Sequence, residues 1–405
     1  MRIYLPLQII QRELDSRLLI AAHLTALGHE VLLGPRPGLL AQRRLLGAGG
    51  VYVLSNAERK GFVTSGSVDD LALVALDEEV LVIDEERFAE GRVDGEMLER
   101  CAVYLCWGER HRDLVVAGFP DAAEKLLIVG NPRLELLRPR FRGLYAGDVA
   151  AIRASVGGRF ILFNATSGLD ALRSTGGPGD FLAAARAAAR SLPDSTVVLR
   201  PHPALGDVPL HSDPELPNLV FANNGSIAPW LLAADVVVHP GCTTAIEARL
   251  LDRPVIRVAT RGNTHRSTQL ADAVSEVVEA PADLIDLLRE AQAGGAIPQP
   301  PLTALNPYFS LDVTSSPAGR IAEIIDRLQP PDAMPAILRE RPDLRRRIRW
   351  MRHGPKDKHW SHIRLRDSRA DVRGRFAAIC DAADLSNTSR ISFPQPRVMR
   401  IRPSR

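Results

Sequence analysis

Polar residues follow directly on a valine-rich segment in the second half of the chain. The segment 235–239 reads DVVVH, and a Pro240-Gly241 turn separates it from the expected start of a helix. Free backbone amides at a helix start, together with two threonine hydroxyls, favour an anion such as a nucleotide phosphate. A carboxylate one turn later can accept hydrogen bonds from ribose hydroxyls, although the same pattern also fits a capping box. The binding residues that this segment predicts are His239, Gly241, Cys242, Thr243, Thr244 and Glu247.

A second histidine turn lies earlier in the same half. The segment 196–200 reads TVVLR and continues into Pro201-His202-Pro203. The prolines restrict the turn, and a histidine held there can donate to a phosphate or, when charged, stabilise a leaving group. A surface turn with no ligand is the alternative. We add Arg200, His202 and Pro203 to the predicted nucleotide site, with Asn164 and Thr166 from the loop after the strand expected at 159–164.

The acidic candidates lie in the first half of the chain. Asp77, Glu78 and Glu79 follow an apolar run over 71–76, and Glu13 and Asp15 come after the first expected strand. A carboxylate that faces a cleft can act as a general base or as a nucleophile on a sugar carbon. The alternatives are a solvated turn for the triplet and an acid that offsets the helix dipole for Asp15. The predicted catalytic residues are Asp77, Glu78, Asp15 and Glu13.

These residues need strands and helices to position them, and the chain alternates the two. Short apolar runs at 2–7, 30–33, 51–54, 71–76 and 103–106 are separated by helical or turn segments, and a second series begins after Gly158. Such alternation predicts parallel sheets covered by helices on both faces. We expect an α/β fold of two doubly wound domains, 1–150 and 151–330, with the helix at 318–328 closing the second. A basic extension, 331–405, follows without a sustained sheet pattern.

Composition narrows the class of protein. The chain has 405 residues, of which 45% are hydrophobic and 24% charged, and only four are cysteines. It has no GxxxxGK[ST] motif, no GxGxxG after a strand, and no spacing typical of a metal site, so we expect neither a metal nor a cofactor. No apolar run reaches the length of a membrane span, and the sparse cysteines suit a reducing cytoplasm.

Charge is distributed unevenly along the chain. Residues 331–405 carry 19 Lys and Arg against 8 Asp and Glu, which leaves 32 against 40 in the first 330 residues. A basic tail of this kind is typical of contact with phosphate. The arginines of 341–352 recur between apolar residues at helical spacing, which favours an anionic bilayer on the inner face of the plasma membrane; a solvated helix is the alternative. The tail has few interleaved aromatic residues, so no nucleic acid is expected.

With these residues assembled, the chain resembles bacterial surface-carbohydrate biosynthesis proteins of GT-B glycosyltransferase architecture, and more distantly capsule enzymes that transfer Kdo and GT-B sialyltransferases. The resemblance covers about residues 1–330. It departs from the family pattern Asp-Glu-Glu-Gly at Val80. The segments that carry it are Arg12-Glu13-Leu14-Asp15, Asp77-Glu78-Glu79, Trp107-Gly108-Glu109, Gly130-Asn131-Pro132-Arg133 with Leu136-Leu137-Arg138-Pro139, and Cys242-Thr243-Thr244-Ala245-Ile246-Glu247-Ala248.

The resemblance implies a metal-independent glycosyltransferase that moves a sugar, CMP-activated and Kdo-like, from a nucleotide donor to a glycan or lipid-linked acceptor. It implies that His202 or His239 contacts the CMP phosphate, that Thr243 and Thr244 hold it, that Glu247 holds the ribose, and that an acid among 77–79 does the chemistry. Three alternatives stay open: a non-hydrolysing UDP-sugar 2-epimerase, a CDP-alcohol phosphotransferase, and an adaptor that binds through the tail.

Overall fold

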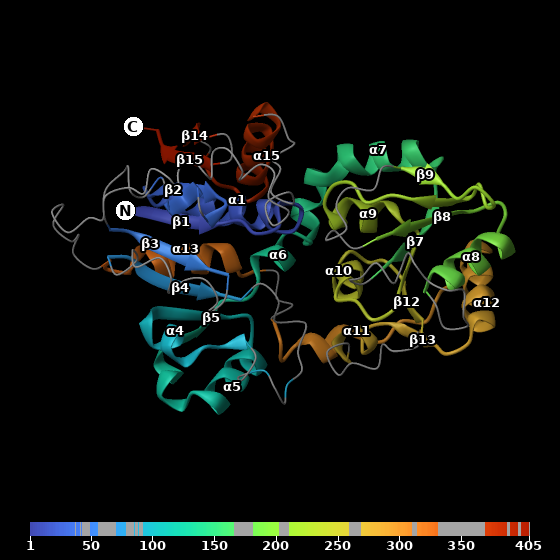
Figure 1. Ribbon diagram of the computed structural model, residues 1–405, viewed down its shortest axis with the longest axis horizontal. Coiled ribbons are helices and arrows are strands. Elements are labelled where there is room, and N and C mark those ends of the chain that lie inside the picture. The colour runs from blue at the N-terminus through green and yellow to red at the C-terminus, as the bar shows by residue number, and fades with distance from the viewer. Residues whose placement is uncertain are drawn as a thin grey trace, which may run out of the picture. The chain divides into compact units, whose positions relative to one another are not determined.

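The computed structural model describes residues 1–404 except 37, 41, 43–48, 56–69, 78–84, 86–87, 89–91, 166–180, 202–209, 259–268, 310–313, 331–368, 387–388 and 396–397. The chain forms two compact units. Unit 1 combines residues from 1–136 with residues from 307–404, and unit 2 comprises residues from 137–306 (Figure 1). Each unit is built on its own sheet.

The sheet of unit 1 is parallel over most of its width. Its central strand β1 has β2 on one side and β3 on the other, in the order β14-β15-β2-β1-β3-β4-β5-β6. Its strands are buried, apolar and rich in Val, Leu and Tyr, as a sheet covered on both faces requires. The parallel strands are β1 (Arg2–Pro6), β2 (Glu30–Gly34), β3 (Val51–Leu54), β4 (Ala72–Leu76), β5 (Cys101–Cys106) and β6 (Leu126–Ile128).

The long helix α1 packs against several other helices of unit 1. It contacts α6, α13 and α15, so the first helix of the chain packs against two helices from its last hundred residues (Figure 1). Its Leu18, Leu19 and Ala21 are buried, which gives these contacts an apolar core. The helices of unit 1 are α1 (Ile10–Ala26), α4 (Gly95–Arg100), α5 (Glu109–Gly118), η3 (Pro120–Lys125), α6 (Pro132–Glu135), α13 (Pro317–Asp326) and α15 (Arg369–Ala382).

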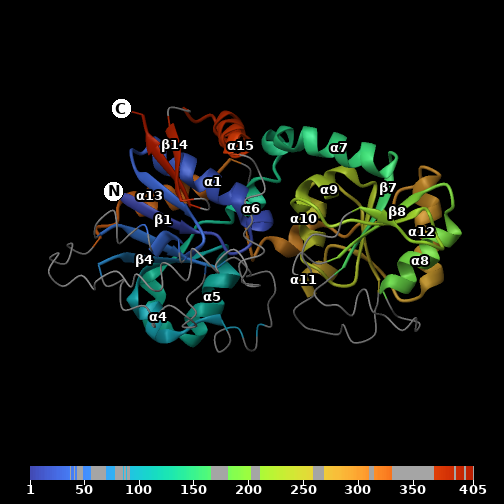
Figure 2. The same ribbon diagram turned by 45° about the horizontal axis from the view of Figure 1, so that its top comes forward.

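The C-terminal residues complete this sheet, which corrects the expectation of a tail without sheet structure. Strands β14 (Ser389–Gln395) and β15 (Val398–Pro403) form an antiparallel hairpin, and β15 pairs antiparallel with β2. Figure 2 shows the hairpin and α15 beside α1 and β2, far from them in sequence. Met399 and Ile401 are buried, so the hairpin is anchored by its apolar face.

Unit 2 repeats the design with a second sheet, ordered β13-β12-β11-β7-β8-β10-β9. Its central strand β7 has β8 on one side, followed by β10 and β9, and β11 on the other, followed by β12 and β13. Among the described strand pairs of this second sheet, only β9–β10 is antiparallel. The strands are β7 (Phe160–Asn164), β8 (Thr196–Arg200), β9 (His211–Ser212), β10 (Leu219–Phe221), β11 (Val236–His239), β12 (Val255–Val258) and β13 (Glu276–Val278).

Helices cover both faces of this second sheet. On one face α8 and α12 pack together over a core of alanines and branched residues, among them Ala185, Ala188 and Leu284. On the other face α7, α9 and α10 lie in succession (Figure 1). The helices are η4 (Pro139–Tyr145), α7 (Ala146–Val156), α8 (Phe181–Ser191), α9 (Ile227–Ala233), α10 (Thr244–Leu250), α11 (Gln269–Asp272), α12 (Pro281–Gln292) and η8 (Leu302–Leu305).

The two units share a GT-B-like plan of Rossmann-like sheets, in agreement with the expected fold class. The divisions differ from the expected boundaries at 150 and 330, since the chain passes between units at 136/137 and at 306/307. Helix α13, expected to close the second domain, belongs to unit 1 instead. Its first turn is bound there: the Ala318 amide donates to the buried Glu135 carboxylate at 3.0 Å.

Candidate functional site

The strongest cluster of polar residues lies at the carboxyl ends of β7 and β11 in unit 2. These two strands are neighbours, and the order of the sheet reverses between them. In open α/β sheets, ligands bind outside the carboxyl ends of the strands at such a reversal. Asn164 ends β7, and its amide nitrogen donates to the Thr244 hydroxyl at 3.0 Å and to the Cys242 sulfur at 3.7 Å. The structure therefore brings together three of the predicted nucleotide-binding residues.

The turn that follows β11 presents unused donors at this edge. Cys242, Thr243 and Thr244 are half-buried, and Gly241 has a φ of 111°, in the region that favours glycine. Within the described part of the chain, the amides of Thr243 and Thr244 make no hydrogen bond. Helix α10 has no side-chain cap, so the alternative of a capping box is not formed here. In the described part of the chain, the amides of Thr243 and Thr244 are thus available to a ligand, next to the Thr244 hydroxyl that Asn164 contacts.

His239 is buried beside this turn, and both of its ring nitrogens contact protein groups. Its Nδ1 accepts hydrogen bonds from the amides of Gly241 and Cys242, each at 3.0 Å. Because Nδ1 accepts, a neutral ring carries its proton on Nε2, which lies 2.9 Å from the Ser275 hydroxyl. Burial, with a smaller effect of Arg257, lowers the pKa of His239 to about 3. The expected phosphate contact through His239 is therefore corrected: both ring nitrogens hold protein groups.

Arg200 and Glu247 also have internal positions. The Arg200 guanidinium donates to the carbonyls of Asn224 at 3.1 Å and Gly225 at 2.8 Å and lies over the Trp230 ring. Its burial lowers its pKa to about 9. The Glu247 side chain faces the interior of unit 2 and is 3% exposed. Both were expected to touch the nucleotide; Arg200 instead holds the turn at 224–225 through these two carbonyls, and Glu247 is buried on α10.

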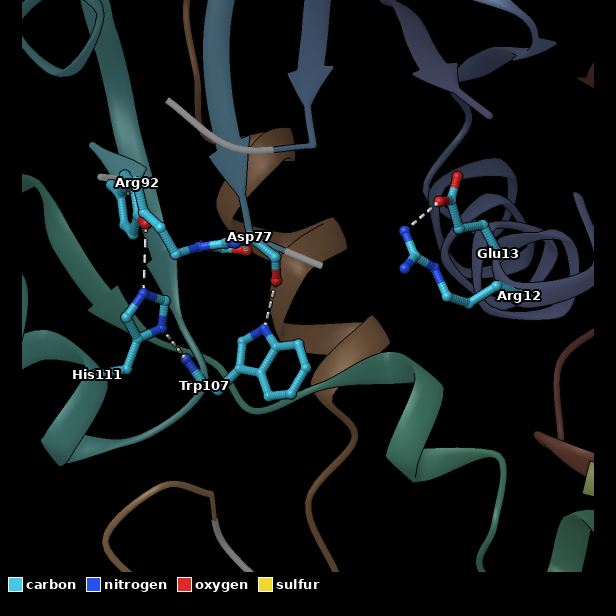
Figure 3. Close-up of polar contacts among 7 residues, drawn as sticks. Arg12, Glu13, Asp77, Arg92, Trp107 and His111 are labelled. Atoms are coloured by element: carbon cyan, nitrogen blue, oxygen red, sulfur yellow. Dashed lines mark hydrogen bonds and ion pairs between the residues drawn. The ribbon is translucent and has the colours of Figure 1, made fainter. Parts of the chain in front are cut away.

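In unit 1 the acidic candidate Asp77 is neutralised by an arginine that the sequence did not reveal. Asp77 follows β4, is fully buried and accepts from Arg92 through both carboxylate oxygens, with Nε at 3.0 Å from Oδ2 (Figure 3). Its backbone carbonyl accepts from the Trp107 indole at 2.7 Å. Arg92 is 15 residues away in sequence. An ion pair holds the carboxylate where the sequence predicted a cleft-facing acid.

His111 organises the neighbouring turn after β5. Its Nδ1 accepts from the Trp107 amide at 3.2 Å, and its Nε2 lies 3.3 Å from the Tyr104 hydroxyl (Figure 3). Burial, reinforced by the charge of Arg92, lowers the pKa of His111 to about 3, so the ring is neutral. No sequence motif singled out His111. Its position, four residues after Trp107 on the first turns of α5, is the signal that was available.

The other two acids have structural partners. Glu13 is fully buried in the first turn of α1, and its carboxylate accepts from the Gln8 amide at 2.7 Å and from Arg12 at 3.1 Å (Figure 3). It closes the loop between β1 and α1. Asp15 is bound by both nitrogens of Arg375 on α15, at 3.0 and 2.7 Å. The catalytic role expected for Asp15 is corrected, because this pair fastens α15 to α1.

The segment 130–135 packs against the start of α13 within unit 1. The Asn131 side chain caps α6 by accepting from the amides of Arg133 and Leu134. A side chain at Gly130 would come within 2.9 Å of Pro317 at the start of α13. This explains the glycine and the asparagine of a segment that the resemblance had marked.

Some predicted residues cannot be placed. Glu78, Glu79, Val80, Thr166, His202, Pro203 and the arginine-rich segment 341–352 lie outside the described residues. Among the residues that are described, no three histidine, cysteine or acidic side chains gather as metal ligands would. No helix in the described part of the chain is long and apolar enough to span a bilayer.

Comparison with known proteins adds evidence on the fold. No protein-family model and no curated protein sequence matches the chain. Among solved structures, a variant of the wall teichoic acid polymerase TagF with CDPG matches at a TM-score of 0.54 and 11% identity, covering 80% of this chain and 87% of that one. The UDP-GlcNAc 2-epimerase of Methanocaldococcus jannaschii matches at 0.51 and 10% identity, covering 80% and 98%.

Coverage of the polymerase varies between its structures. Another TagF structure matches at a TM-score of 0.40 and 16% identity, and there the match covers 56% of this chain and 58% of that chain. The two matches with TM-scores of 0.54 and 0.51 support the GT-B-like fold. They leave the reaction to be inferred from the residues at the strand ends.

Proposed function

We propose that this protein is a GT-B glycosyltransferase of surface-polysaccharide biosynthesis that holds the nucleotide of an activated sugar on unit 2. The observation that carries the proposal is the group of Asn164, Cys242, Thr243 and Thr244 at the point where the strand order of unit 2 reverses. The nucleotide phosphate would accept from the amides of Thr243 and Thr244. Such preorganised donors stabilise charge that develops on a leaving phosphate.

In the proposed reaction, the neutral hydrogen-bond donors of unit 2 hold the nucleotide phosphate. His239 keeps the turn in shape by accepting two amides, and Asn164 orients the Thr244 hydroxyl. The donor is proposed to be CMP-linked and Kdo-like, as the resemblance implies, and the acceptor a glycan or a lipid-linked glycan. On unit 1, Asp77 and Glu78 are proposed as the acids, with Asp77 held in place by its ion pair with Arg92.

Two other reactions fit the same fold. A UDP-sugar 2-epimerase is favoured by the match that spans 98% of the archaeal epimerase, and it would need no acceptor. A CDP-alcohol phosphotransferase is favoured by the TagF match with CDPG. The three differ in products: a transferase needs donor and acceptor, an epimerase changes a UDP-sugar alone, and a phosphotransferase consumes CDP-glycerol.

The test is a calorimetric titration of the full chain with CMP, CDP, UDP and GDP. We expect CMP or CDP to bind, and Thr244→Val to weaken that binding about 10-fold or more, the loss of a hydrogen bond to a charged group. Thr196→Val is the matched control, since Thr196 bonds to Val156 at the opposite end of the same sheet. Unchanged binding by Thr244→Val, or no binding of any nucleotide, contradicts the proposal. Binding of UDP alone moves it to the epimerase.

A further inference from the structure

A row of charged residues crosses four strands of unit 1. Arg390 on β14 lies opposite Arg402 on β15, Arg402 bonds to Glu30 on β2, and Glu30 lies opposite Arg2 on β1. Arg400, two residues before Arg402, bonds to the same Glu30 carboxylate. We call Arg2, Arg390, Arg400, Arg402 and Glu30 the arginine row.

The row has more positive charge than it can neutralise. One carboxylate serves three arginines, since Arg2 also donates to Glu30 at 2.8 Å. Arg390 is exposed and has no acidic partner among the described residues. Like charges directly opposite on neighbouring strands are destabilising, and Arg390 faces Arg402. An external anion would offset the repulsion between Arg390 and Arg402.

Exposed apolar residues lie at the same end of unit 1. Met1 precedes Arg2, and its carbonyl accepts from the Glu30 amide. The turn that leads into β2 contains Leu27; Leu27 is 45% exposed and Met1 is 39% exposed. Asp326, an acid at this end, is paired with His29 at 2.9 Å. Arginines beside exposed apolar side chains are the combination that an anionic bilayer surface accepts.

The row lies away from the residues assigned to chemistry. Arg2 and Glu30 begin their strands, whereas Asp77 follows the carboxyl end of β4 in the same sheet. Figure 1 shows both chain ends at this end of the unit, beside β1, β14 and β15. A substrate phosphate bound at the carboxyl ends of the strands would not reach the row.

We propose that the arginine row, with Met1 and Leu27, is a docking surface for a bilayer that contains anionic phospholipid. This goes beyond the proposed function and does not depend on it. It places the membrane contact on the described C-terminal hairpin. The phosphate groups of the lipid neutralise Arg390 and Arg402, and the two apolar side chains enter the interface.

The experiment is sedimentation of the full chain with vesicles of phosphatidylcholine, alone or with 30% phosphatidylglycerol. We expect binding to the anionic vesicles only, and a loss of about 30-fold in the Arg390→Gln/Arg402→Gln double variant, about fivefold for each arginine near a charged surface. The control is Arg159→Gln/Arg289→Gln, which removes two exposed arginines from unit 2. Thermal unfolding of each variant shows that it is folded.

Leu27→Ser separates a bilayer from a soluble polyanion. We expect it to weaken vesicle binding while binding to soluble polyphosphate, measured in parallel, stays unchanged. The proposal is overturned if the wild-type chain ignores anionic vesicles, if the double variant binds them as tightly as the control, or if polyphosphate binds and vesicles do not. Nucleotide titration of the double variant keeps this outcome apart from the proposed function, since that titration is expected to be unchanged.

Discussion

Each unit has a buried, neutral histidine close to the carboxyl end of a strand. The two histidines accept hydrogen bonds from backbone amides that lie on opposite sides of them in the sequence. In unit 2, His239 ends β11 and accepts the amides two and three residues ahead of it. In unit 1, His111 lies on α5 and accepts the amide four residues behind it. In both, Nδ1 accepts a backbone amide and Nε2 lies beside a hydroxyl, of Ser275 or of Tyr104.

The difference lies in what surrounds the two turns. Around His111 the polar groups are charged and satisfied, because Arg92 neutralises Asp77 inside the unit. In the turn after His239, the side chains of Cys242, Thr243 and Thr244 are neutral and half-buried, and the amides of Thr243 and Thr244 make no hydrogen bond in the described part of the chain. Removing one partner of a buried ion pair is strongly destabilising, whereas unused neutral donors suit a ligand that brings its own charge. This difference supports the proposal that unit 2 holds the nucleotide.

The largest effect should come from breaking the ion pair of unit 1. Arg92→Ala leaves the Asp77 carboxylate buried without its partner, and we expect a loss of about 3–5 kcal/mol in the free energy of unfolding. Asn164→Ala, the change at the corresponding edge of unit 2, should cost about 1 kcal/mol, since only neutral hydrogen bonds are lost. Urea denaturation measures both. Equal losses of unfolding free energy in the two variants would contradict this difference between the units. The control is Arg159→Ala, which breaks an exposed ion pair with Asp235.

The two histidines predict a second effect, on acid stability. The pKa of each is lowered to about 3, whereas an unfolded histidine titrates near 6.5. The unfolded chain therefore binds more protons between these values, and stability falls as the pH drops from about 6.5 toward 3. Between pH 7 and pH 5 the loss is about 2 kcal/mol for each histidine.

Hydrogen exchange resolves this acid effect by unit. His239→Asn keeps an acceptor for the turn but cannot be protonated, so it should flatten the pH dependence for peptides around 236–250 and leave it unchanged around 104–118. A flattening in both units would mean that they do not lose structure independently.

The smallest effect concerns the hydroxyl behind His239. Ser275 accepts from the His239 ring and donates to the Ala271 carbonyl at 2.6 Å. Ser275→Ala leaves Nε2 without an acceptor, and we expect a loss of about 1–2 kcal/mol and a two- to fivefold weaker nucleotide affinity as the turn loosens. Ser155→Ala, which removes a hydroxyl bond on α7, should leave the affinity unchanged.

Much of the fold followed from the sequence because its parallel strands are short, apolar runs of recognisable length. The runs at 51–54 and 196–200 coincide with β3 and β8 as the structure has them. The hairpin of β14 and β15 was not predicted from the sequence. Its arginines mask the alternation of apolar residues, among them Ile391 and Ile401, that would have indicated strands. Helix α13 was placed in the wrong unit because its apolar face does not say which partner it packs on.

The site was predicted in part for the same reason. Residues next to each other in sequence, such as Cys242 and Thr244, could be found, and Asn164 was recognised as a strand end. The partners that decide the roles are distant in sequence: Arg92 for Asp77, Arg375 for Asp15, and Ser275 for His239. Spacing alone carries no information on such pairs, so Asp15, which binds α15 through Arg375, was taken for a catalytic acid.

The pairing of β15 with β2 has a consequence for the order in which the protein is made. A ribosome releases unit 2 as one uninterrupted stretch, while the sheet of unit 1 waits for its last strand. Until then β2 presents an open edge of unpaired backbone groups, the kind of edge that recruits other chains. Nascent chains stalled before the hairpin should therefore need a chaperone more than those stalled after it.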